Sequence, residues 1–77
     1  MALIRRFVHR PDASPRFRTE VDCGWTVAEL PSGRILHLET YGSGERSIPG
    51  KVSQSLELDA DAARELRSIL DKAFPER

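Results

Sequence analysis

The strongest constraint on the fold is a series of alternating segments that ends in one amphipathic helix, between Gly24 and Phe74. Apolar and polar residues alternate in residues 25–30, 35–41 and 52–58, which is the period of a half-buried β-strand. Residues 60–74 change to the apolar spacing of an α-helix. A single helix covers at most one face of a small sheet. We therefore expect the other face to be left for a partner.

A further alternating segment, residues 16–22, precedes these strands and ends at a tight reversal at residues 23–24. Residues 31–34, Pro-Ser-Gly-Arg, have the composition of a turn, and residues 42–50 form a longer Gly/Pro loop. Short turns join strands that lie antiparallel to each other. The expected fold is therefore α+β: a four-stranded antiparallel meander followed by one C-terminal helix.

The helix has recognisable start and stop signals. Asp59 stands where its carboxylate can accept from the first free backbone amides, and Asp61 adds negative charge to the first turn. Pro75 ends the helix. The helix carries one apolar stripe, which consists of Ala62, Ala63, Leu66, Ile69, Leu70, Ala73 and Phe74.

The N-terminal residues 1–14 are predicted to form a basic arm in front of a domain at residues 15–77. Residues 3–10 alternate between apolar and basic side chains and could form a short strand, and residues 11–15 contain two prolines that break the chain. The first 18 residues hold five arginines against one aspartate, so this end could meet a polyanion. The alternative is an ordinary solvated surface with uneven charge.

The length of 77 residues allows one domain, whose core supplies about 3–5 kcal/mol of net stability. Small domains usually add disulfides, a metal or a second subunit. Cys23 is the only cysteine, which excludes an internal disulfide, and no Cys/His cluster offers a metal site. We therefore expect a homodimer without metal or cofactor.

The expected location is the cytoplasm, which the single unpaired thiol favours. No apolar run approaches the ~20 residues of a membrane span. Residues 1–8 lack a clean apolar stretch and a small-residue cleavage site, so they are not expected to be a signal peptide.

No sequence motif indicates catalysis. The serines lie outside any G-x-S-x-G elbow, and residues 42–44, Gly-Ser-Gly, lack the lysine of a phosphate-binding loop. His37 is read as a structural or surface residue of its strand, and helix capping explains Asp59 and Asp61. The chain is therefore expected not to be an enzyme.

Single-stranded nucleic acid is the first partner that the sequence suggests. Binding requires cations for the phosphates and exposed aromatic rings on which bases stack. The candidate residues are Arg16, Arg18, Trp25, Arg34, Tyr41, Arg46 and Lys51. The alternative for Trp25 is a place in the core, because the chain has few large apolar residues.

The order of these parts resembles the bacterial branch of the positive cofactor four family, transcriptional coactivator-like proteins that bind single-stranded DNA. The resemblance covers residues 15–74 and is carried by GWTVAEL, PSGR, ILHLETY, GSGERSIPGK, SLELD and AARELRSIL. It implies four antiparallel strands, a C-terminal helix and a homodimer with the helices at the subunit interface. That interface would use Leu66, Ile69, Leu70 and Phe74.

The same resemblance assigns roles to the candidate binding residues. It implies that Arg34 and Lys51 contact phosphates and that Trp25 and Tyr41 stack on bases, while Arg16 and Arg18 extend the cationic track. The chain departs from the family in its shorter loop after Tyr41. It also carries Glu29 and Glu39 in strands that are more basic in typical members.

Two functions follow as expectations. The first is a non-catalytic protein that binds single-stranded DNA or RNA largely without sequence preference and serves transcription, replication or repair. The second is a small homodimeric module of the same fold that binds another protein and no nucleic acid. A third and weaker alternative is an enzyme whose site is shared between chains.

Overall fold

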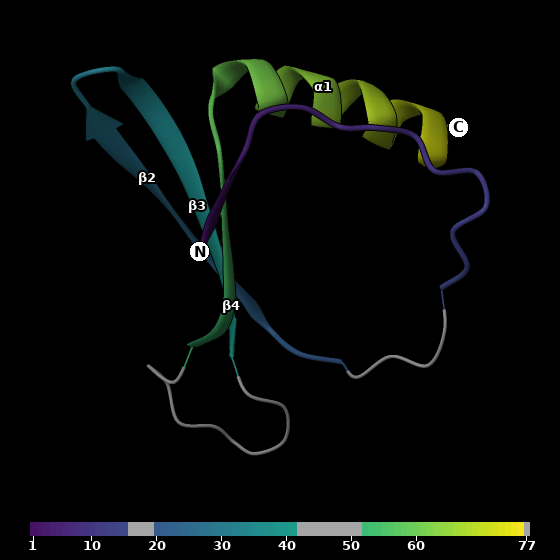
Figure 1. Cartoon of the computed structure of the whole chain (residues 1–77), viewed down its shortest axis with the longest axis horizontal. Helices are drawn as coiled ribbons and strands as arrows, with labels where there is room; N and C mark the ends of the chain where they lie inside the picture. Colours follow the sequence, from purple (N-terminus) through teal and green to yellow (C-terminus); the bar gives the residue numbers. More distant parts are fainter. Residues whose placement is uncertain (16–19, 42–51, 77) are drawn as a thin grey trace.

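The computed structural model describes residues 1–15, 20–41 and 52–76 (Figure 1). Predicted candidates Arg16, Arg18, Arg46 and Lys51 lie outside these residues. The described elements are four strands and one helix: β1 (Ala2–Ile4), β2 (Cys23–Leu30), β3 (Gly33–Tyr41), β4 (Val52–Leu58) and α1 (Ala60–Ala73). A four-stranded sheet with one C-terminal helix is thus confirmed, and the class is α+β.

The predicted antiparallel meander is wrong in one strand. The sheet has the order β1-β4-β3-β2, in which β2, β3 and β4 are antiparallel neighbours and β1 lies parallel to β4. The expected strand at residues 16–22 does not appear in its described part, residues 20–22, and its remainder lies outside the described residues. Alternation shows that a segment suits a β-strand, but it does not show which neighbouring strand the segment will pair with. In the structure, residues 2–4 pair with the free edge of β4.

The β2–β3 hairpin turns at Pro31 and Ser32, as the sequence predicts. Leu30 pairs with Gly33, whose φ of 134° lies in a region that residues with a side chain rarely adopt. The predicted reversal at residues 23–24 is wrong, because these residues are the first two of β2. Gly24 lies opposite Glu39 instead, within the antiparallel ladder.

Helix α1 begins and ends where the sequence predicts. The carboxylate of Asp59 accepts a hydrogen bond from the backbone N–H of Ala62 at 2.9 Å. At the other end, the backbone N–H of Phe74 donates to the carbonyl of Leu70, and Pro75 follows. Among the described residues, no helix combines the length and the apolar character that a membrane crossing requires.

The strand register gives the sheet two different faces. One face, here called the apolar face, carries the Glu29–Arg34 pair and a set of apolar side chains: Ile4, Trp25, Val27, Leu36, Leu38, Leu56 and Leu58. The other face, here called the polar face, carries the apolar pair Ala28 and Ile35, of which Ile35 is buried, and a set of mostly polar residues: Gly24, Thr26, His37, Glu39, Tyr41, Ser55 and Glu57. Each face therefore presents its own chemistry to a partner.

The core is small, and much apolar surface stays exposed. Ile35, Leu58 and Ala62 are the hydrophobic residues that the described chain buries fully. Helix α1 contacts β3 and β4 and then extends away from the sheet (Figure 1). Consequently the apolar face is only partly covered, with Val27 and Leu56 exposed.

Candidate functional site

Trp25 is exposed and does not belong to the core. Its relative exposure is 71%, on the apolar face of β2, an edge strand of the described sheet. An indole at such a position is accessible both from its face and from the strand edge. The alternative that placed Trp25 in the core of the monomer does not hold.

Arg34 lies on the same side of the sheet as Trp25. Its Nε atom is 2.7 Å from Oε2 of Glu29, its direct partner across β2 and β3. Glu29 follows Trp25 by four residues on β2, so the cation and the ring are separated by about 13 Å along the strand. Both members of the ion pair are exposed, and exposed pairs are weak, so a phosphate could replace the Glu29 carboxylate.

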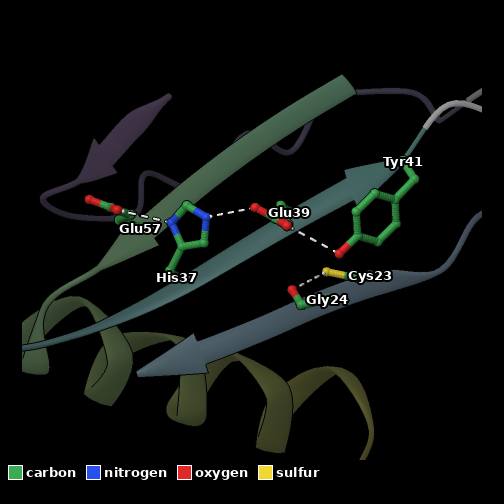
Figure 2. Close-up of polar contacts among 6 residues, drawn as sticks. All are labelled: Cys23, Gly24, His37, Glu39, Tyr41 and Glu57. Carbon is green, nitrogen blue, oxygen red and sulfur yellow. Dashed lines mark hydrogen bonds and ion pairs between the residues drawn. The ribbon is translucent and has the colours of Figure 1, made fainter. Parts of the chain in front are cut away.

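Tyr41 points to the opposite side from Trp25. Its hydroxyl donates a hydrogen bond to Oε2 of Glu39 at 3.1 Å and lies over Gly24 (Figure 2). A Cβ atom at position 24 would collide with this hydroxyl, so only glycine leaves room for the ring. The structure therefore does not bring the two predicted stacking residues together on one face.

The polar face holds a connected group of side chains, here called the histidine cluster: His37, Glu39, Tyr41 and Glu57. The imidazole of His37 lies between two carboxylates, with Nδ1 2.9 Å from Oε2 of Glu57 and Nε2 3.0 Å from Oε1 of Glu39 (Figure 2). Tyr41 extends the chain of hydrogen bonds through Glu39. The cluster links β3 to β4 by side-chain contacts.

Charge explains how the histidine cluster titrates. Hydrogen bonds to Glu39 and then to Glu57 raise the pKa of His37, because both carboxylates favour the imidazolium form. The hydrogen bonds from His37 and Tyr41 lower the pKa of Glu39. The carboxylate of Glu39 in turn raises the pKa of Tyr41, since it stabilises the neutral hydroxyl.

Both nitrogens of the imidazole in the histidine cluster have carboxylate partners. Both ring nitrogens of His37 are occupied, so neither is free to abstract a proton or to bind a metal. Within the described ranges, no group of three or more His, Cys, Asp or Glu side chains is arranged to hold a metal ion. The sequence placed His37 and Glu39 on one strand. The contact of His37 with Glu57 depends on the β3–β4 register, which the sequence analysis did not predict.

The predicted dimer residues lie along α1 with increasing exposure. Leu66 is half-buried, while Ile69, Leu70 and Phe74 are exposed, Phe74 to 75%. Leu66, Leu70 and Phe74 are four residues apart and therefore form one ridge on the helix. Because this ridge projects beyond the sheet, the monomer leaves it largely uncovered.

The fold and the site define a small α+β domain with one apolar and one polar sheet face. Comparisons with protein-family models, curated proteins and solved structures found no match to this chain.

Proposed function

We propose that this chain is a non-catalytic, homodimeric domain that binds single-stranded nucleic acid largely independently of sequence. The observation that carries the proposal is the exposure of Trp25, a large ring held on a rigid strand at the edge of the sheet. Stacking of one base on an exposed ring contributes about 1–3 kcal/mol and tolerates any base. Arg34 on the same side supplies a cation for the phosphates.

The homodimer is supported by the balance between buried and exposed apolar surface. The described chain buries three hydrophobic residues fully, yet exposes large side chains on both the sheet and the helix. Chains of this size have small cores and commonly gain stability from a second subunit. A second copy that packs against Leu66, Leu70 and Phe74 supplies it, and Trp25 can stay accessible because it lies on β2, the edge strand beyond β3.

The charges of the two sheet faces indicate where a bound nucleic acid would run. Glu39 and Glu57 on the polar face repel phosphates, and His37 compensates at most one of their charges. We therefore place the nucleic acid along the outer edge of β2 and the Trp25 side of the sheet. Arg5, Arg6 and Arg10 in the N-terminal arm are exposed and add positive charge to the molecule.

A second candidate function is binding of a protein partner by the same dimer. The observation that favours it is the pair of carboxylates on the polar face, together with the exposed apolar side chains. This function does not require any cation to be free. The two candidates predict opposite results for the same binding assay.

The test is a titration of a labelled oligothymidylate at two salt concentrations with wild-type protein, Trp25→Ala and Val27→Ala. Val27 lies on the same strand and face and is also exposed, so it is a matched control. Trp25→Ala should weaken binding by roughly 5- to 150-fold, the loss of one stacked base, while Val27→Ala should change it little.

Arg34→Glu combined with Lys51→Glu should abolish binding while the protein stays dimeric. If wild-type protein does not bind the oligonucleotide at low salt, nucleic-acid binding is wrong and the protein-partner function remains.

A further inference from the structure

The N-terminal arm is attached to the helix rather than free. Beyond β1 the chain runs beside α1 (Figure 1), and the backbone N–H of Phe7 donates to Oε1 of Glu65 at 2.9 Å. Phe7 is half-buried, whereas its neighbours Arg6 and Val8 are exposed. This contact holds a segment from the start of the chain against a helix near its end.

A hollow of about 770 Å³ lies between the arm and the helix. Its apolar lining comes from Phe7 and Val8 of the arm and from Ile69 and Ala73 of α1. Arg10 and Lys72 also line it, one from each wall. The volume is within the range of small-molecule sites, about 300–1,000 Å³.

The chemistry of the lining selects an organic anion. Apolar side chains favour a flat or aliphatic body, and the two cations favour a negative group. Glu65, the carboxylate in the lining, is held toward the arm by its hydrogen bond from the Phe7 N–H. Nε of Arg10 lies 3.7 Å from Oδ1 of Asp12, and both side chains are exposed. Exposed ion pairs are weak, so a phosphate can replace the Asp12 carboxylate.

The hollow and the proposed dimer ridge use different flanks of α1. Glu65, Ile69 and Lys72 follow each other at spacings of four and three residues and so share one flank. Leu70 and Phe74 lie on the neighbouring ridge. Ile69, which the sequence assigned to the dimer interface, lines the hollow instead.

We propose that this hollow holds one nucleotide unit, with the base on Phe7 and Ile69 and the phosphate between Arg10 and Lys72. The inference rests on the proposed function, because a bound single strand is one source of that unit. A free nucleotide is the other source. The hollow would then be a second contact site for the bound nucleic acid, which would run from Trp25 at the β2 edge to the helix.

The experiment compares wild-type protein with Arg10→Glu/Lys72→Glu and with the control Arg67→Glu. Arg67 lies on the same helix, is exposed and does not line the hollow. The double variant should lose oligothymidylate affinity, and the log–log slope of affinity against salt should become shallower by about 0.7, the value for the one phosphate contact that is lost. The Arg67→Glu control should retain more of the wild-type affinity and of the wild-type salt slope than the double variant does. Arg10→Met/Lys72→Met retains long side chains and answers the same question should the charge reversal prevent folding.

The outcomes separate the two proposals. If the double variant binds the oligonucleotide as wild type while Trp25→Ala does not, the hollow is wrong and the proposed function stands. If wild-type protein binds no oligonucleotide but thymidine monophosphate shifts the NMR signals of Phe7 and Lys72, the hollow is right and the proposed function is wrong. If neither ligand binds, both are overturned.

Discussion

His37 and Glu57 are direct partners across β3 and β4, and their side chains meet with Nδ1 2.9 Å from Oε2. They are 20 residues apart in the sequence, so only the strand register brings them together. The second ring nitrogen of His37 binds Glu39 on its own strand. A protonated His37 therefore joins two strands by charge-assisted hydrogen bonds.

The stability of the fold should depend on pH through this cluster. Because the pKa of His37 is raised, its stabilisation is fully present below its ordinary value of 6.5 and is lost as the pH rises through the folded value. The pKa of Glu39 is lowered, so its stabilisation is present above 4.5 and is lost as the pH falls through the folded value. Urea midpoints measured from about pH 4 to about pH 9 should therefore be highest between these limits.

His37→Gln is the control for the alkaline side of this profile. Glutamine can donate one hydrogen bond to a carboxylate but carries no charge. The decrease in the urea midpoint on the alkaline side should disappear in this variant. A decrease of the same size in both proteins would show that another group causes it.

The sequence was sufficient for the elements whose signals are local. Alternation placed β2, β3 and β4, and the Asp59 cap placed the start of α1. A short strand was expected within residues 3–10 and appears as β1 at Ala2–Ile4, but its pairing with β4, far along the chain, was not predicted. Parallel pairing requires a long crossover, which local patterns do not reveal.

The candidate site was predictable only in part, for a physical reason. Alternation assigns Trp25 to the apolar side of its strand but does not say whether a helix reaches that strand. Among the described elements, α1 contacts mainly β3 and β4, and the ring of Trp25 is exposed. The opposite orientation of Tyr41 follows from the β2–β3 register, which pairs Trp25 with Leu38, and from alternation along β3, which puts Tyr41 on the other side from Leu38.

Gly24→Ala should destabilise the protein through Tyr41. The new methyl group would overlap the hydroxyl oxygen and approach the ring carbon Cζ to 3.3 Å, which forces the ring away from Glu39. Adding a methyl group where there is no room costs about 1–3 kcal/mol, measurable by urea unfolding. Tyr41→Phe removes the overlapping atom, so the double variant should be less destabilised than the sum of the two single variants. Full additivity would show that the two residues do not interact.

Asp59→Ala should weaken the start of α1. The substitution removes the acceptor for the Ala62 N–H, and loss of such a cap costs about 1 kcal/mol. Asp59→Asn retains a side-chain oxygen at the same place and should restore most of the stability. Thermal unfolding followed by circular dichroism measures both. Equal destabilisation by the two substitutions would mean that the negative charge, rather than the hydrogen bond, stabilises the helix.

Leu70→Glu should convert the proposed dimer into a monomer. Leu70 is 47% exposed in the single chain, so a charged residue there is tolerated by the monomer but would be buried between two copies. Sedimentation equilibrium should give twice the monomer mass for wild-type protein and the monomer mass for the variant. Arg64→Glu, an exposed position about 160° around the helix from Leu66, should stay dimeric. A wild-type protein that sediments as a monomer at every concentration would contradict the dimer, and Leu66, Leu70 and Phe74 would then be available for a different protein.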